Sequence, residues 1–291
     1  MSSHRTTADV LEDHRAAGKF VDVGGLNTFV LDKGTGEAVL CLHGVPTSSF
    51  LYRKVIDELV MRDLRGISFD FPGLGLSDRP KDFDYGFASL ARFAARVADT
   101  LKLDRYHLVV HDVGGPVGFA LAADQRDRIR SLTILNTWID VVNFKKPLPM
   151  RPFELPLAGE AELATINHLT WQLMWKGLGV ADADQIPKEE SNAYVDLLKR
   201  DDGGKAFLRI MRNFADTDAF RDRCYRAVRN VPYPVQAIWG SEDPALTYER
   251  YGEEIKRIAG LSHIHQVPGK HFLQEDNAPA IAAQIAAFTK P

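Results

Sequence analysis

The run LVVHDVGGPVG at residues 108–118 constrains this chain more than any other stretch. Residues 108–111 have the apolar character of a buried strand end, a single carboxylate follows at Asp112, and a helical run begins shortly after it. A strand that turns directly into a helix in this way presents its one polar side chain at the tip of a sharp turn. Gly114 and Gly115 allow the strand and helix backbones to pass closely. We therefore interpret Asp112 as a carboxylate nucleophile.

Strand and helix patterns alternate along the first half of the chain. Residues 20–31 indicate a β-hairpin across a Gly-Gly turn, and residues 38–42 form the continuous apolar run of a strand buried on both faces. Further strands are predicted at residues 66–70, 106–111 and 129–136, with helical segments between them. We predict an α/β fold in which helices flank a mostly parallel eight-stranded sheet. Ligands should bind beyond the carboxyl ends of its strands.

The alternation stops past residue 136. Residues 140–230 contain several helical segments, no convincing strand, and prolines at 147, 149, 152, 156 and 187. The strand pattern returns at residues 234–240. We therefore predict two domains, a helical cap inserted after the sixth strand (residues 140–230) and an α/β core (residues 1–139 and 231–291).

Composition and charge argue against several classes of protein. The net charge of −3 gives no reason to expect a nucleic acid or an anionic membrane as partner. No apolar stretch approaches the ~18 residues of a membrane span, and the N-terminus lacks the apolar segment of a signal peptide. The two cysteines lie far apart and give no support to a metal site. We expect a cytoplasmic monomer or homodimer that uses no metal and no cofactor.

A carboxylate nucleophile needs a base that activates water, an acid that orients this base, and donors for developing negative charge. We predict His271 as the base, because it follows the last predicted strand and precedes the final helix. The simpler interpretation of such a residue is a surface loop histidine. His43 and His111 are alternative bases, but both adjoin strand ends, where we expect roles in positioning the backbone.

The orienting acid is predicted at Asp243, in the loop after the strand that follows the cap. The chain order of nucleophile, acid and histidine that goes with this kind of turn supports that choice. Its neighbour Glu242 is an alternative if the register is shifted by one residue. Asp140 is a second alternative, because it follows the strand after the nucleophile.

Two backbone N–H groups are predicted to stabilise an oxyanion, those of Val113, directly after the nucleophile, and Val45, in the loop after an earlier strand. In the predicted mechanism, Asp112 displaces a leaving group from an sp³ carbon and forms an alkyl ester. His271, held by Asp243, then activates water to attack the ester carbonyl. A carboxylate suits this chemistry because its ester is hydrolysed at its own carbonyl, whereas a serine ether would be a dead end.

Four segments together resemble the haloalkane dehalogenase branch of the α/β-hydrolase fold superfamily. They are HGVPTSSFLYR at 43–53, DFPGLGLSD at 70–78, HDVGG at 111–115 and HFLQED at 271–276. The resemblance implies an Asp-His-acid triad and a helical cap over an apolar pocket, with a small apolar organic substrate and water as partners. Epoxide hydrolases share the nucleophile and the His-Gly-x-Pro loop and are close relatives.

Two residues depart from the dehalogenase pattern. The family usually has Trp directly after the nucleophile as a halide donor, and this chain has Val113; Val45 stands where Asn is a common second donor. A halide released into a dry pocket without donors is strongly disfavoured. Trp171 and Trp175, at i and i+4 on one helix face, and Trp138, at a strand end, are predicted to line the pocket and replace these donors. Alternatively, the three tryptophans pack the cap onto the core.

The leading prediction is therefore hydrolytic dehalogenation of a small organohalide, weakened or altered by the missing donors. Epoxide hydrolysis is the alternative, and it requires an acid for the opening oxygen, normally a pair of cap tyrosines. Tyr194 and Tyr225 are available in the cap, and Tyr233 lies just beyond it. A non-catalytic binding protein is the third alternative, and the presence of an intact predicted triad argues against it.

Overall fold

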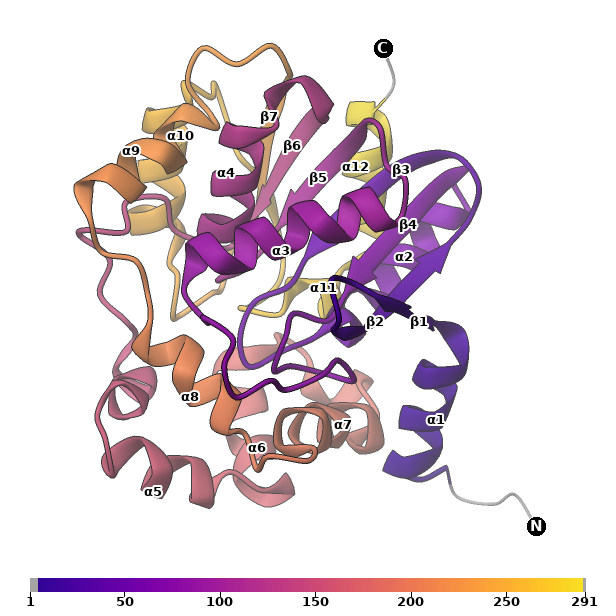
Figure 1. The fold of residues 1–291 in the computed structure, drawn as a ribbon, viewed down its shortest axis with the longest axis vertical. Coiled ribbons are helices and arrows are strands. Elements are labelled where there is room, and N and C mark those ends of the chain that lie inside the picture. The colour runs from indigo at the N-terminus through magenta and orange to yellow at the C-terminus, as the bar shows by residue number, and fades with distance from the viewer. Residues whose placement is uncertain (1–4, 290–291) are drawn as a thin grey trace.

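The computed structural model describes residues 5–289, which form an eight-stranded sheet covered by helices on both faces (Figure 1). The order of the strands across the sheet is β1-β2-β4-β3-β5-β6-β7-β8. β2 runs antiparallel to β1 and β4, and the other neighbouring pairs are parallel. The predicted α/β fold with a mostly parallel sheet is confirmed. The strands are β1 (Lys19–Asp22), β2 (Asn27–Lys33), β3 (Glu37–Leu42), β4 (Leu64–Phe69), β5 (Tyr106–Val110), β6 (Ile129–Leu135), β7 (Val235–Gly240) and β8 (His265–Val267).

Successive side chains of a strand point into two separate hydrophobic cores, one on each face of the sheet. In β3, Leu40 and Leu42 belong to one core, and Val39 and Cys41 belong to the other. Because both faces are buried, the strand is apolar throughout. The first core includes side chains from α3 (Phe87–Thr100), α4 (Gly114–Asp124) and α10 (Glu253–Ala259), and the second from α2 (Arg53–Val60), α11 (Leu273–Asp276) and α12 (Ala278–Thr289).

The chain between β6 and β7 is helical. Its helices are α5 (Ala158–Thr165), α6 (His168–Met174), α7 (Lys188–Lys199), α8 (Lys205–Arg212) and α9 (Asp218–Arg226). We call α5–α8 the cap helices; they lie together at the bottom of Figure 1. In contrast, α9 packs against α4, and Cys224 Sγ lies 3.9 Å from the carbonyl oxygen of Pro116. A helical insertion after the sixth strand is thus confirmed, whereas the domain limits at 139/140 and 230/231 stay a prediction.

The N-terminal helix α1 (Thr7–Ala17) connects the two parts of the molecule, because it packs against cap helix α7. Thr6 and Asp9 begin this helix with reciprocal bonds between side chain and backbone, a capping box. Its buried residues are Val10 and His14, and the His14 ring contacts aromatic rings of the core. Every helix within residues 5–289 is too short or too polar to cross a lipid bilayer.

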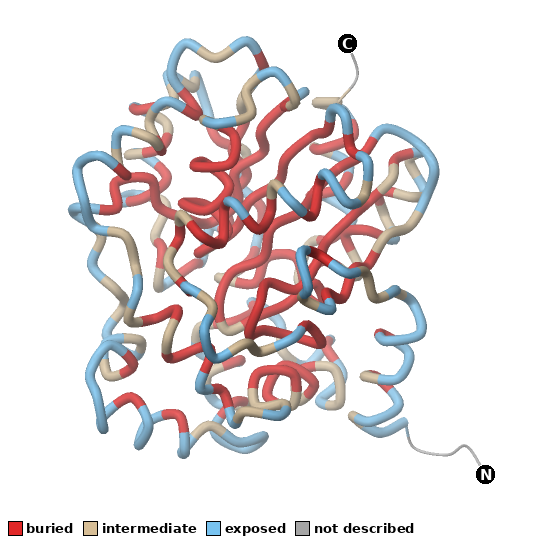
Figure 2. Tube along the Cα trace, in the orientation of Figure 1, coloured by how far each residue is buried: buried red, intermediate tan, exposed pale blue. Residues whose placement is uncertain are grey.

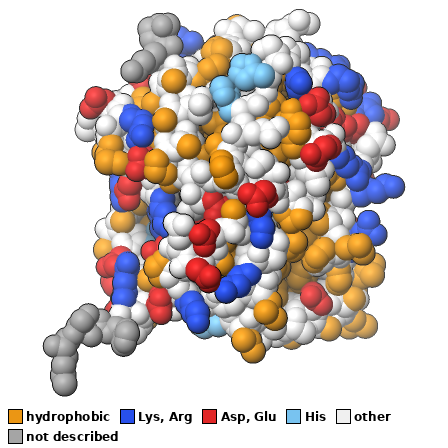
Figure 3. Space-filling view, turned by 180° about the vertical axis from the view of Figure 1, so that it is seen from behind, with side chains coloured by type: hydrophobic (Ala, Val, Ile, Leu, Met, Phe, Trp, Pro, Cys, Tyr) orange, Lys and Arg blue, Asp and Glu red, His pale blue; other side chains and the backbone are white. Residues whose placement is uncertain are grey.

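Burial differs between the sheet and the cap helices. Figure 2 shows buried strands at the centre and exposed stretches along the outer sides of the cap helices. Seen from behind, in Figure 3, hydrophobic side chains gather on the surface at the lower right, which is the cap side. The exposed leucines of this part of the chain are Leu148, Leu155, Leu157, Leu169 and Leu173.

Candidate active site

The turn between β5 and α4 holds Asp112 in a left-handed conformation, with φ of 50°. Such a φ is rare for a residue with a side chain and is maintained only where the surroundings enforce it. Both following glycines are required by space: a Cβ on Gly114 would lie 2.3 Å from the Leu42 carbonyl oxygen, and one on Gly115 would lie 1.9 Å from Thr137 Oγ1. The close approach of backbones predicted at this turn is therefore present.

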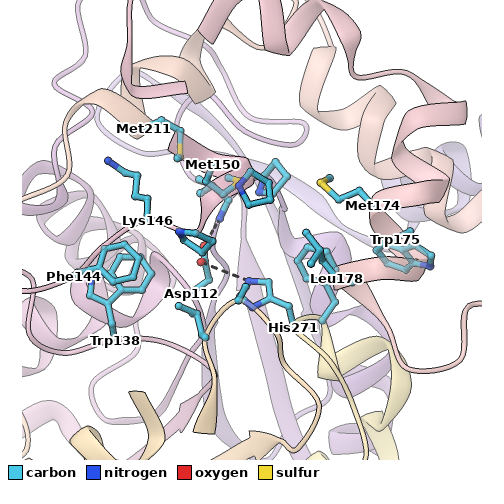
Figure 4. A pocket seen from close by; sticks show the side chains of 18 of the residues that line it. Asp112, Trp138, Phe144, Lys146, Met150, Met174, Trp175, Leu178, Met211 and His271 are labelled. Carbon is cyan, nitrogen blue, oxygen red and sulfur yellow. Dashed lines mark hydrogen bonds and ion pairs between the residues drawn. The ribbon is translucent and has the colours of Figure 1, made fainter. Parts of the chain in front are cut away.

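Three loops at the carboxyl ends of strands bring Asp112, His271 and Asp243 together (Figure 4). His271 Nε2 lies 3.7 Å from Asp112 Oδ2, and His271 Nδ1 lies 2.9 Å from Asp243 Oδ2. The Asp243 side chain is completely buried, whereas those of Asp112 and His271 retain a small exposed fraction. The imidazole thus stands between two carboxylates, one reachable from a cavity and one enclosed.

Asp243 is fixed by four donors. Its Oδ1 accepts the N–H groups of Ala245 and Leu246 at 2.8 and 2.9 Å, and its Oδ2 accepts the Asn136 side-chain amide at 2.7 Å in addition to His271. Our sequence analysis missed Asn136. The available signal was a polar residue directly after Ile134 and Leu135, the apolar end of β6.

The alternative acids have other surroundings. Asp140 accepts hydrogen bonds from the backbone N–H groups of Val142 and Asn143, both at 3.1 Å, and from the Asn143 side chain at 2.8 Å. Glu242 is exposed. Neither carboxylate is hydrogen bonded to His271, so the structure places only Asp243 on the base.

The alternative bases, His43 and His111, are enclosed and engaged with the backbone. His43 Nδ1 lies 2.8 Å from the Gly44 carbonyl oxygen, and its Nε2 accepts the Phe71 N–H at 3.2 Å. His111 Nε2 lies 2.8 Å from the carbonyl oxygen of His271. Burial lowers the pKa of His43 to about 4 and that of His111 to about 3. Both rings are therefore neutral at pH 7 and position the loops around the site.

Val45 donates its N–H to Oδ1 of Asp112 at 2.8 Å. The N–H of Val113, the next residue, is among the groups that favour the charged form of this carboxylate. These are the two residues predicted as oxyanion donors. Oδ1 is therefore anchored, while Oδ2 faces His271 and the cavity beyond it (Figure 4).

The three ionisable groups favour an ion pair in the resting site. Burial by itself lowers the pKa of His271, but the carboxylates of Asp243 and Asp112 outweigh it and raise this pKa to about 10. Burial by itself raises the pKa of Asp112 and of Asp243, and the interaction with His271 reverses both shifts, so each pKa lies below its usual value. A charge lost from Asp112 would therefore lower the pKa of His271.

A cavity of about 80 Å³ opens in front of Asp112 and His271. All three predicted tryptophans line it, and so do aromatic, proline and methionine side chains from the segment between β6 and β7. Trp138 stacks on Phe144 with ring centroids 3.8 Å apart. The buried indole N–H groups of Trp171 and Trp175 have no hydrogen-bond partner among the described residues. In Figure 4 the indole nitrogen of Trp175 points away from Asp112.

The tyrosines considered as acids do not line this cavity. Tyr194 donates to Glu275 at 2.5 Å, and Tyr233 donates to the Ala227 carbonyl oxygen at 2.7 Å. Burial and the nearby carboxylate of Asp140 raise the pKa of Tyr225 to about 12. The geometry thus gives no support to a tyrosine acid.

Lys146, which our sequence analysis did not single out, also lines the cavity. It lies in an irregular segment rich in proline, where neither helical nor strand periodicity indicates the direction of a side chain. Its position therefore became apparent only in the folded chain.

Comparisons with known proteins identify the family of this chain. Residues 37–278 match the family described as alpha/beta hydrolase fold, so the chain belongs to the α/β-hydrolases. Haloalkane dehalogenase 2 of Mycobacterium bovis is 32% identical over 265 residues, which cover 88% of this chain and 88% of that relative. The chain is accordingly a hydrolase of the haloalkane dehalogenase-like branch of this family. The resemblance predicted from four short segments is confirmed.

Solved structures show the same architecture. Cfl2 from Burkholderia cenocepacia has a TM-score of 0.81 at 22% identity, covering 94% of this chain and 95% of its own. The haloalkane dehalogenase DbeA from Bradyrhizobium elkani USDA94 has a TM-score of 0.77 at 25% identity, covering 94% of this chain and 97% of its own. The first of these likenesses extends to the fold alone.

Proposed function

We propose that this hydrolase cleaves the carbon–halogen bond of a small organohalide through a covalent ester on Asp112. The observation that carries the proposal is the state of this carboxylate. One oxygen is anchored by Val45, while the other faces an apolar cavity beside His271. An apolar cavity suits an uncharged reacting carbon and excludes the bulk water that would weaken the nucleophile.

In the first step Asp112 Oδ2 attacks the sp³ carbon that bears the halogen. The new carbon–oxygen bond forms as the carbon–halogen bond breaks, and the halogen leaves with the electron pair as halide. Asp112 becomes a neutral ester whose carbonyl oxygen, Oδ1, remains hydrogen bonded to the Val45 N–H group.

In the second step His271 Nε2 takes a proton from water, and the water oxygen attacks Cγ of Asp112. Two features of the site support this role. Ester formation removes one of the two carboxylate charges that raise the pKa of His271, so the imidazolium of the resting site releases its proton to solvent and the neutral ring can then accept one from water. Negative charge then develops on Oδ1, where Val45 already donates and Val113 is proposed to become the second donor. Asp243 stabilises the imidazolium until the alcohol and the free carboxylate are regenerated.

The halide needs a donor, and Trp171 is our proposal for it. A buried N–H without a hydrogen-bond partner costs about 1–3 kcal/mol, and a halide that accepts a hydrogen bond from this N–H would offset the cost. Trp171 and Trp175 both have a buried indole N–H without a partner among the described residues. The Trp175 nitrogen, however, points away from Asp112 in Figure 4. In this proposal residues 140–230 act as a cap that supplies the substrate pocket, and the core supplies the triad.

The test separates the two steps. We expect wild-type protein to release halide from short bromoalkanes and chloroalkanes. His271→Ala should lower turnover by about 10²–10⁴-fold, because water loses its general base, and the peptide that contains Asp112 should gain the mass of the alkyl group. His263→Ala, at an exposed histidine, is the matched control. Diol formation from epoxides, or turnover with an unmodified Asp112 in His271→Ala, would contradict the proposal.

A further inference from the structure

A second cavity adjoins the one in front of Asp112. It measures about 350 Å³, and its walls include the charged side chains of Glu154, Arg212 and Asp216. Four residues line both cavities, and they mark the place where the two meet: Phe144, Lys146, Met211 and Phe214. We call the cavity in front of Asp112 the reaction cavity. Its walls are mostly apolar, and where the two cavities meet it borders a cavity with charged walls.

Lys146 is the only Lys or Arg that lines the reaction cavity within residues 5–289. Its side chain is 10% exposed, and its ammonium lies 4.0 Å from the centroid of the Phe214 ring. An ammonium has three N–H donors. One is used by Glu154 at 2.5 Å, and the described residues supply no other hydrogen-bond partner. Lys146 thus retains donors for a ligand in the cavity.

The existing partner of Lys146 is easily exchanged. The Glu154 side chain is 42% exposed, and a pair with so accessible a carboxylate is weak. The neighbouring cation, Arg212, is less available because both of its terminal nitrogens bind Glu160, at 2.9 and 2.8 Å. An anion that enters the apolar cavity would therefore be bound by Lys146.

We propose that the natural substrate is an organohalide with a carboxylate at the end far from the carbon–halogen bond, and that Lys146 binds this carboxylate. In Figure 4 the Lys146 ammonium points away from Asp112, and Lys146 also lines the second cavity, so the cation lies where the two cavities meet. This arrangement keeps the carboxylate of the substrate apart from the negative charge of Asp112. Water and the haloacid give a hydroxy acid, halide and a proton. The inference rests on the proposed function.

Two matched series of probes test this inference, terminally chlorinated alkanoates from chloropropanoate to chlorooctanoate and 1-chloroalkanes of equal carbon number. We expect an optimum chain length among the acids, at which kcat/KM exceeds that of the matched chloroalkane at least about tenfold, as expected for a charge-assisted hydrogen bond. Lys146→Met should lower this acid-to-neutral ratio about tenfold. Glu154→Gln, which removes the competing carboxylate, should lower KM for the acids. Lys188→Met, at an exposed lysine of α7, should leave the ratio unchanged.

Binding is measured separately from turnover, with hexanoate and hexanol as unhalogenated ligands in calorimetry. Hexanoate should bind wild type more tightly than hexanol, and Lys146→Met should abolish the difference. Equal binding of both ligands, or an acid-to-neutral ratio unaffected by Lys146→Met, would overturn the inference while leaving the dehalogenase proposal intact. Hexanoate binding through Lys146 without halide release from either series would instead refute the proposed function and retain the carboxylate site.

Discussion

The α/β core and the cap helices dispose their hydrophobic side chains differently. In the core, β3 and its neighbours bury side chains on both faces, and Leu40 is fully enclosed. In the cap, Trp171 of α6 and Trp175, directly after α6, line the cavity, while Leu169 and Leu173 of α6 are more than two-thirds exposed. A core packed on all sides tolerates little change, whereas a layer packed on one side can vary. We therefore expect the core to determine the chemistry and the cap to determine the choice of substrate.

A buried group of charges joins these two regions. Arg53 of α2 pairs with Glu275 of α11 and with Glu190 of cap helix α7, and Tyr194 of α7 donates to Glu275 at 2.5 Å. The Glu275 side chain is completely buried. Burial by itself raises the pKa of Glu275, but Arg53 and Lys54 outweigh it and hold the pKa below its usual value. The cap is therefore attached directly beside the loop that carries His271.

The largest loss of stability should come from Glu275→Gln, which weakens the contact between the core and the cap helices. The substitution leaves the buried Arg53 with less negative charge, and breaking a buried pair in this way costs about 3–5 kcal/mol. Urea unfolding measures the loss of stability. Asp13→Asn, which breaks the exposed pair with Arg5, is the control and should cost about 0–1 kcal/mol. Equal losses in the two variants would show that the charges beneath the cap do not hold it.

A smaller change in stability is expected when pH is raised, because His271 in the core loses its proton. The pKa of His271 is raised to about 10 in the folded protein, above about 6.5 in the unfolded chain. Its contribution to stability is complete below the unfolded value and is lost as pH rises through the folded value. Asp112→Asn removes one carboxylate from the ring, so the pKa of His271 should fall and less stability should be lost between neutral pH and pH 10. Histidine NMR titration and unfolding at both pH values check this, and coincident curves for wild type and Asp112→Asn would argue against the ion pair.

The smallest change in stability should come from a substitution on the exposed outer side of the cap helices. Leu169 is 74% exposed, so Leu169→Ser should change the free energy of unfolding by less than about 0.5 kcal/mol. Leu40→Ala in β3 is the matched core substitution and should cost about 2–5 kcal/mol. Thermal and urea unfolding compare the two variants. A large loss in Leu169→Ser would mean that this face of the cap is packed in solution.

The core was predictable because its signals are local. The apolar run at residues 38–42 and the glycines after Asp112 determine a buried strand and a sharp turn from neighbouring residues alone. The positions of Asp243 and His271 followed from the order of strands, whereas their assigned roles remain to be tested. Asn136 had a readable signal, a polar residue directly after the apolar end of β6. Lys146 had none, because tertiary packing of an irregular segment directs it into the cavity.

Asn136 also bears on how such a molecule can be rebuilt. Its side-chain oxygen accepts the Gly240 N–H at 2.9 Å, and its amide reaches Asp243. Asn136 therefore connects the end of β6 to the end of β7, the two strands between which the helical segment is inserted. The same residue also holds Asp243. Because both ends of this helical segment are fixed at one residue, we expect that the segment can be exchanged between relatives as a unit. Chimaeras that keep Asn136 and Gly240 should inherit the reaction from one parent and the choice of substrate from the other.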